Sequence, residues 1–308
     1  MISFRYSQKD SVIHRLNPFC KILWLVSILV LSLIMDHPLF LLLILLSTLP
    51  VVLSADIMKE WLSFMKFVPF LVMAIIVINA LMSFHGETVL WQAPFTIPAM
   101  GQPRIAMESI IYGLGMSLRL AAIISAFAVT TLTIHPDDMM LAMIKMRLPY
   151  KSVLVTSLST RFMPTLIDDA ERITDAQRSR AVELDSGRLH RRIGRRISIL
   201  IPLLANSLDR TMQVAEAMDA RAFGSGSRRT YYREIRFSAV DVASIVMALA
   251  PLALGIFVAT LGYSSYRYYP TLGAINLCAA GWAALAVLAL LLCAPAAMGL
   301  IKRRIDLD

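Results

Sequence analysis

The sequence predicts an all-α polytopic membrane protein with about six transmembrane helices and a cytoplasmic insertion of amphipathic helices. Of its 308 residues, 57% are hydrophobic and 17% are charged, whereas soluble domains average about 45–50% apolar and about 25% charged residues. The mean hydropathy is +0.67. The charge is unevenly placed, because 18 Lys and Arg residues lie between Lys145 and Arg236 and the apolar blocks contain almost none.

Six apolar blocks approach the length of about 20 mostly apolar residues that a membrane-spanning helix needs. The first two are short and are separated only by Asp36 and His37. The blocks are Ile22–Met35, Pro38–Leu53, Phe67–Phe84, Ile110–Ile134, Val240–Tyr263 and Thr271–Met298. We therefore expect an N-terminal membrane region at 1–134 with about four spans. A C-terminal membrane region at 238–308 should hold about two spans and a basic tail.

Lysine and arginine near the ends of the spans predict the orientation, because these residues stay on the cytoplasmic side of a membrane. With six spans, the basic N-terminal segment, the second connection with Lys59 and Lys66, the insertion and the tail Lys302–Arg304 all fall on one side. The opposite loops hold Arg104 and Arg267. We expect a multi-pass protein of the cell membrane with both termini in the cytoplasm.

The connection Phe84–Glu108 is rich in proline and also contains Gly101 and Trp91. This composition predicts an irregular external loop or a re-entrant hairpin. The aromatic cluster at Tyr263–Tyr269, like Trp91, is expected to anchor the chain at the membrane interface.

The segment 135–237 is too polar to lie in lipid, and its pattern is typical of amphipathic helices. Three helices are expected, at Asp137–Leu148, Pro164–Gly187 and Ile197–Phe223. Apolar residues recur with helical spacing in the second and third of these, which predicts one apolar face on each helix. We expect the helices to shield these faces against one another and against the membrane surface.

Arginine gathers at the ends of the second and third helices of the insertion. Arg180 falls in the C-terminal third of the second helix and Arg221 in the last turn of the third. On residue type alone, both are most simply solvated arginines that complement a helix dipole. Exposed arginines at helix ends also suit a partner that offers carboxylates, because the guanidinium group pairs with them through two hydrogen bonds. Between the helices, Arg191, Arg192, Arg195 and Arg196 are expected to face anionic lipid headgroups.

Four pieces of the chain resemble a known family, the T component of energy-coupling factor (ECF) transporters. The segments AQRSRAVELD (Ala176–Asp185) and AMDARAFG (Ala217–Gly224) are similar to the paired Ala-Arg-Gly signatures of that family. SVIHRLNPFCKI near the N-terminus and HPDDMMLAMIKMRLPY with RFMP at the start of the insertion are the other two pieces. The resemblance covers nearly the whole chain in order.

The resemblance implies a transmembrane coupling subunit of an ECF-type ABC importer for a vitamin or a transition-metal ion, with no ATPase of its own. It also implies three kinds of partner: two ABC-type ATPase subunits, a small membrane subunit (the S component) that binds the substrate, and membrane lipids. Carried over residue by residue, the ATPase-binding signatures are Ser179-Arg180-Ala181 and Ala220-Arg221-Ala222. Ala181 and Ala222 stand where the family usually has glycine, and Ser179 stands where it has alanine.

Other function classes find less support in the sequence. A conventional ABC-type permease with its own homodimeric pore remains the alternative, and it would need a central polar pathway. A membrane anchor that binds RNA or DNA is disfavoured, because the insertion lacks interleaved aromatic residues, so no nucleic-acid partner is expected. There is no Walker-type glycine loop, HExxH motif or CxxC pair, so we expect neither catalysis nor a cofactor or metal site.

Overall fold

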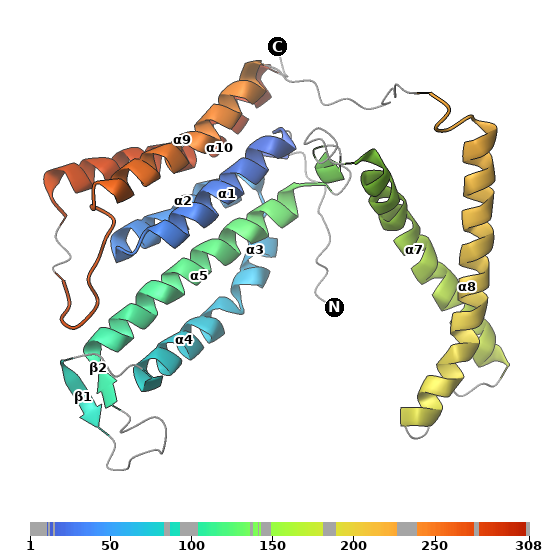
Figure 1. The fold of residues 1–308 in the computed structure, drawn as a ribbon, viewed down its shortest axis with the longest axis horizontal. Coiled ribbons are helices and arrows are strands. Elements are labelled where there is room, and N and C mark those ends of the chain that lie inside the picture. The colour runs from blue at the N-terminus through green and yellow to red at the C-terminus, as the bar shows by residue number, and fades with distance from the viewer. Residues whose placement is uncertain are drawn as a thin grey trace. The chain divides into compact units, whose positions relative to one another are not determined.

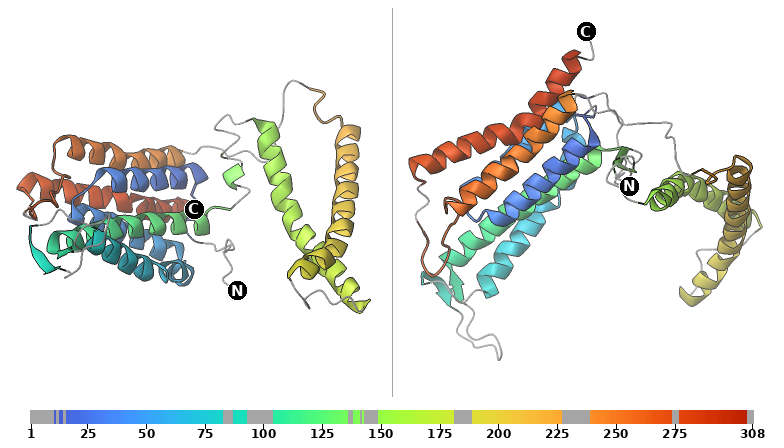
Figure 2. Two further views of the ribbon diagram at one scale, coloured as in Figure 1. Left: turned by 60° about the horizontal axis from the view of Figure 1, so that its bottom comes forward. Right: turned by 45° about the horizontal axis from the view of Figure 1, so that its top comes forward.

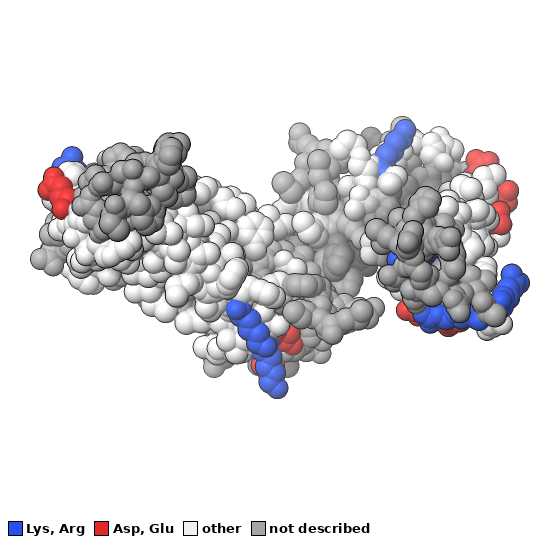
Figure 3. Space-filling view, turned by 90° about the horizontal axis from the view of Figure 1, so that it is seen from below, with Lys and Arg blue, Asp and Glu red and all other residues white. Residues whose placement is uncertain are grey.

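The computed structural model describes residues 11, 13–14, 16–82, 87–92, 104–135, 138–140, 142, 149–180, 189–226, 239–273 and 277–305. The chain divides into two compact units. We call Met1–Met139 with Ile235–Asp308 the membrane unit, and Met140–Glu234 the insertion unit. Figure 3 shows a face on which the described surface of the membrane unit is largely uncharged, whereas Lys, Arg, Asp and Glu gather on the insertion unit.

The membrane unit is a bundle of helices (Figure 1). Its helices are α1 (Pro18–Ile34), α2 (Pro38–Ala55), α3 (Met58–Met65), α4 (Val68–Met82), α5 (Met107–Thr133), α9 (Ala239–Thr260) and α10 (Ala279–Ile305). Within the described ranges, five helical stretches are long and apolar enough to cross a membrane, and α1 is a shorter apolar helix. The prediction of an all-α polytopic membrane protein is therefore confirmed.

The first two helices begin at prolines that follow a capping side chain. Asn17 caps α1 and His37 caps α2, and each accepts a hydrogen bond from the amide two residues further on. A side-chain acceptor at the cap satisfies an amide that has no partner within the helix, and proline suits the first helical position. The two residues that separate the predicted spans, Asp36 and His37, thus form part of the turn that starts α2.

Helix α1 is held in the bundle by polar side chains that bond to the backbone of its neighbours. Ser27 Oγ donates to the carbonyl of Ala248 in α9 at 2.7 Å, and Cys20 Sγ donates to that of Ser244 at 3.2 Å. Ser27, Ile28 and Leu31 are completely buried. Such hydrogen bonds and small residues let helices pack closely where lipid offers no hydrophobic driving force between them.

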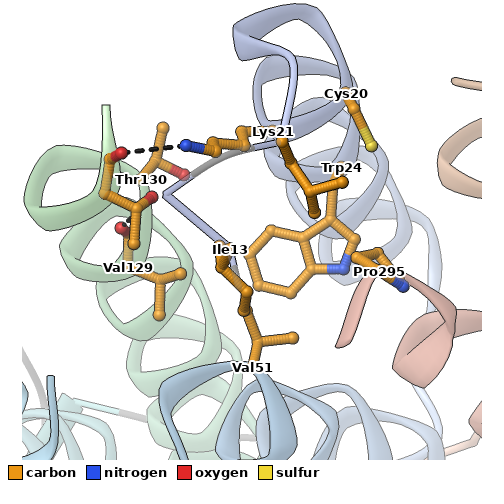
Figure 4. A pocket seen from close by; sticks show the side chains of 10 residues that line it. Ile13, Cys20, Lys21, Trp24, Val51, Val129, Thr130 and Pro295 are labelled. Atoms are coloured by element: carbon orange, nitrogen blue, oxygen red, sulfur yellow. Dashed lines mark hydrogen bonds between the residues drawn. The ribbon is translucent and has the colours of Figure 1, made fainter. Parts of the chain in front are cut away.

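One buried lysine joins α1 to the C-terminal end of α5. Lys21 Nζ donates to the carbonyl of Thr133, the last residue of α5, at 2.9 Å (Figure 4). Trp24 and Val129 lie beside this bond and line a space of about 10 Å³. A single water needs about that volume, so the junction is a packing contact and not a ligand site.

The connection between α4 and α5 contains a short hairpin. Strand β1 (Val89–Gln92) pairs antiparallel with β2 (Arg104–Ala106), with Trp91 opposite Ile105. The amide of Thr88 donates to the carboxylate of buried Glu108 in the first turn of α5, at 3.1 Å. The sequence predicts an irregular external loop or a re-entrant hairpin here; the described part forms a short β-hairpin, and its place relative to the membrane stays a prediction.

The insertion unit contains two long helices, α7 (Tyr150–Ser179) and α8 (Leu189–Ala220) (Figure 2). The predicted start at Pro164 is wrong, because α7 runs through this proline and begins at Tyr150. The predicted stop at Gly187 is also wrong, since α7 ends at Ser179. Helix α8 starts eight residues before the predicted Ile197. Of the predicted helix at 137–148, only 138–140 and 142 are described, and these are helical.

Candidate functional site

The first predicted signature lies at the end of α7. Ser179 is the last helical residue, and its hydroxyl donates back to the carbonyl of Asp175 at 3.0 Å. Arg180 is the C-cap residue, and its amide bonds to the carbonyl of Gln177 at 3.1 Å. Its backbone thus closes the helix and its side chain stands at the negative end of the helix dipole. Ala181 lies outside the described residues.

The second signature ends α8 in a Schellman motif. The amide of Ala222 bonds to the carbonyl of Asp219 at 2.8 Å, and that of Phe223 bonds to Met218 at 3.0 Å. These two bonds make Arg221 the C-cap and Ala222 the residue after it, which has a left-handed backbone with φ of 54°. Glycine is the usual residue at this position because it has no Cβ. Ala222 therefore stands at a backbone position that favours glycine, the residue that the resemblance leads us to expect there.

The two arginines occupy equivalent positions on their helices, and both are exposed. In the described part of the chain, neither guanidinium group makes a hydrogen bond or an ion pair. The neighbouring Arg178 differs, because it lies 3.8 Å from the carboxylate of Asp175 in an exposed pair. Arg180 and Arg221 are thus available to an external partner.

An ion pair joins α7 and α8. Arg210 Nη2 of α8 donates to Asp169 Oδ2 of α7 at 3.0 Å, and both side chains are about two-thirds or more buried. Arg180 follows Asp169 by eleven residues, and Arg221 follows Arg210 by eleven residues. At 1.5 Å per residue, each arginine lies about 16 Å beyond the ion-paired residue of its own helix. The two helices run in opposite directions (Figure 1), so their C-terminal ends, which carry the arginines, point to opposite ends of the pair.

Both helices of the insertion unit carry apolar side chains that the described residues leave exposed. On α8 they recur mainly every three or four residues, and on α7 they are more widely spaced. The α8 row consists of Ile197, Leu200, Ile201, Leu204, Leu208 and Met212, and the α7 row of Val155, Met163 and Ile167. Contiguous exposed apolar surface of this kind marks an interaction site. Within the described residues the two helices leave these side chains exposed, and the expected shielding against one another and against the membrane surface stays a prediction.

Sequence reasoning missed a charged residue inside the membrane unit. Arg119 lies within α5, one of the predicted spans, and its partner is Asp36 at the turn between α1 and α2. An arginine within an apolar span is itself a signal of function. Among the described residues there is no group of three or more His, Cys, Asp or Glu placed to hold a metal ion.

Comparison with known proteins gives consistent matches over most of the chain. The sequence profile of a family described as "CbiQ: Cobalt transport protein" matches residues 9–232. The energy-coupling factor transporter transmembrane protein EcfT of Bacillus selenitireducens is 30% identical over 254 residues, covering 80% of this chain and 91% of that protein. EcfT of Streptococcus thermophilus is 32% identical over 259 residues, with 81% and 95% covered. EcfT of Lactococcus lactis is 30% identical over 266 residues, with 82% and 97% covered.

Proposed function

The chain belongs to the family of ECF transporter T components, and from this premise we propose that it couples two ATPase subunits to a substrate-binding membrane subunit. ATP binding and hydrolysis would move the ATPases, and α7 and α8 would carry this movement to the membrane. The cargo would be a vitamin or a transition-metal ion. The observation that carries the proposal is the pair of exposed arginines at the C-caps of α7 and α8, whose guanidinium groups have no partner among the described residues.

The chemistry of the two helix ends supports an acidic binding surface on each ATPase. Arg180 and Arg221 are exposed and free of intramolecular partners among the described residues. A guanidinium group binds a carboxylate through two parallel hydrogen bonds, which fixes direction as well as charge. Ser179 and Ala220, the residues just before the arginines, are small and leave room for a groove wall to approach the backbone.

The equal spacing from the ion pair to each arginine supports two equivalent ATPase partners. Each arginine lies eleven residues beyond the residue of its own helix in the Asp169–Arg210 ion pair, on helices that run in opposite directions. Two copies of one ATPase, related by a twofold axis, would present identical binding grooves to two such helix ends. The partly buried ion pair would hold the two helices together during the movement.

The exposed apolar rows supply the surface for the third partner. The row of α8 from Ile197 to Met212 has no cover among the described residues. We assign this row to the small membrane subunit that binds the substrate. An apolar contact between helices tolerates sliding better than ion pairs do, because it lacks directional bonds, and such sliding would let the subunit tilt.

The test reverses the charge of Arg180 and of Arg221, the arginines at the tips (the C-terminal ends) of α7 and α8, in the assembled transporter. The full chain is co-expressed with its two ATPases as wild type, Arg180→Glu, Arg221→Glu and the double variant. Arg172→Glu is the matched control, because Arg172 is also exposed on α7 but lies away from its tip. Co-purification of the ATPases and the ATPase activity of the membrane-reconstituted complex are measured.

Loss of one partner from a desolvated charge pair costs about 2 kcal/mol or more, which corresponds to about 30-fold in affinity. We therefore expect each tip variant to weaken ATPase attachment by at least that factor and the control to retain it. Undiminished attachment of the double variant would contradict the proposal. Uptake by the chain and its ATPases without any further membrane subunit would instead favour a permease with its own pore.

A further inference from the structure

A polar recess lies beside the turn between α1 and α2. The part of α5 that lines it belongs to the apolar span. Its volume is about 260 Å³, and its lining includes Asp36, Tyr112, Gly115, Arg119, Tyr266 and Tyr268. The three tyrosines and the two charged residues come from the α1–α2 turn, from α5 and from the α9–α10 connection. No role in attaching ATPases explains this recess.

The charged floor of the recess is an ion pair within the apolar span of α5. Arg119 Nη2 donates to Asp36 Oδ1 at 2.7 Å and to the carbonyl of Met35 at 3.0 Å. Arg119 follows the first residue of α5 by twelve residues, or about 18 Å along the helix. An arginine at the centre of a span costs about 2.5–3.5 kcal/mol on insertion scales, so its presence calls for a functional explanation.

The length of α1 bears on the depth of the recess. Helix α1 has 17 residues and is about 25 Å long, which is close to the roughly 30 Å of a bilayer's hydrocarbon core. A helix of this length that crosses the core ends near its boundary, so the turn at Asp36 is expected near the level of the lipid headgroups. Leu33 and Leu42, on either side of this turn, are exposed and offer an apolar surface to acyl chains.

Tyrosine rings form the wall of the recess. Tyr268 makes edge-to-face contacts with Tyr112 at 5.3 Å and with Tyr266 at 4.7 Å between ring centroids. The Tyr268 hydroxyl donates to the carbonyl of Asp36 at 2.7 Å. A Cβ at position 115 would lie 2.5 Å from that hydroxyl oxygen, so glycine is what lets the ring reach the turn.

Three groups in the recess keep free binding capacity. Asp36 uses one carboxylate oxygen for Arg119, and its side chain is 54% exposed. The hydroxyl of Tyr112 has no hydrogen-bond partner among the described residues, whereas those of Tyr266 and Tyr268 are both engaged. On Arg119, Nη1 donates among the described residues only to the sulfur of Met116, at 3.4 Å, and so keeps a further N–H. The recess thus offers an open carboxylate, aromatic rings, a free hydroxyl and a guanidinium group with unused donors.

These groups together match a small zwitterion. Aromatic faces beside a carboxylate attract an ammonium group, and a guanidinium group binds a phosphate. The volume is below the roughly 300–1,000 Å³ of sites for drug-sized ligands, so a headgroup fits better than a vitamin. We propose that the recess binds the phosphoethanolamine headgroup of a membrane phospholipid, with its ammonium on Asp36 and the tyrosines and its phosphate toward Arg119.

Native mass spectrometry of the detergent-purified full chain tests this site. The probes are phosphatidylethanolamine, phosphatidylglycerol and water-soluble glycerophosphoethanolamine. Asp36→Asn removes the charge but keeps an acceptor for Arg119, and Tyr112→Phe removes only the free hydroxyl. Arg267→Gln is the control, since Arg267 is exposed in the same α9–α10 connection but is not among the recess residues.

We expect phosphatidylethanolamine to bind about 10-fold or more tightly than phosphatidylglycerol, because a charged hydrogen bond distinguishes them. Asp36→Asn should abolish that preference, Tyr112→Phe should weaken phosphatidylethanolamine binding several-fold, and the control should change neither. Equal binding of the two lipids to the unchanged protein would overturn the proposal, as would an unchanged preference in Asp36→Asn. Equally strong binding of glycerophosphoethanolamine would overturn the lipid as its source. None of these outcomes depends on the ATPases, so the coupling role stands or falls separately.

Discussion

Ala222, which has a left-handed backbone at the end of α8, allows a prediction about stability. Glycine at this position and glycine two residues earlier should change the stability of the helix end in opposite directions. Ala222 has a φ of 54°, a conformation that costs an L-residue about 1–2 kcal/mol. Glycine removes this cost, but it also raises the conformational entropy of the unfolded chain, which lowers the stability of the folded state by about 0.4–1 kcal/mol. Ala222→Gly should therefore stabilise the end of α8 by about 0.5–1 kcal/mol. Ala220→Gly changes the last helical residue and should destabilise it by a similar amount.

Amide hydrogen exchange of the full chain in detergent measures this difference. The reporter is the amide of Phe223, which bonds to the carbonyl of Met218 in the Schellman motif. A change of 0.5–1 kcal/mol corresponds to about 2–5-fold in an opening equilibrium. Exchange should slow by that factor in Ala222→Gly and accelerate in Ala220→Gly. Acceleration in both variants would refute the assignment of Ala222 to the left-handed position and show that residue 222 continues the helix.

Three further predictions concern the stability of the two units. Lys21→Met should lower the free energy of unfolding by about 1–3 kcal/mol, because the carbonyl of Thr133 loses a buried donor. Burial lowers the pKa of His37 below 6.5, so its neutral form stabilises the fold above pH 6.5. That contribution should be lost as the pH falls from 6.5 through the lowered pKa, at up to about 1.4 kcal/mol per pH unit. A double-mutant cycle of Asp169→Asn and Arg210→Gln should give a coupling free energy of about 1 kcal/mol, reduced by salt because the pair is partly exposed.

The first two of these have a matched control in thermal or chemical unfolding of the detergent-purified chain. Lys59→Met changes an exposed lysine and should leave stability within about 0.5 kcal/mol. His37→Asn retains a side-chain cap acceptor but does not titrate, so its stability should lose the acid-dependent decline. A decline of equal slope in His37→Asn would show that another group causes it.

Apolar composition was enough to predict the class of the fold, because spans are specified by length and hydrophobicity with little dependence on tertiary contacts. The two long helices of the insertion were harder. Pro164 looked like a helix start since proline removes a backbone donor, yet it lies inside α7. The surrounding helical sequence on both sides outweighs that local cost in the structure.

Features that depend on contacts between distant residues could not be predicted. Arg119 and Asp36 are 83 residues apart in sequence, so nothing local indicates that each neutralises the other. The backbone of Ala222 was also hidden, because an alanine usually continues a helix and a glycine usually marks its end. The signature residues Arg180 and Arg221 could be named from the resemblance, and their attachment to ATPases stays a prediction.

The bond between Lys21 and Thr133 bears on how force passes along the chain. Unwinding α5 from its C-terminal end must first break this 2.9 Å bond, and the lysine is itself fixed on α1 among buried neighbours. A pull on the chain at residue 134 would accordingly be transmitted through Lys21 to α1 and the rest of the bundle, and α5 would not unwind alone. The helices of the membrane unit would then move together as one rigid body, which a subunit that transmits motion requires.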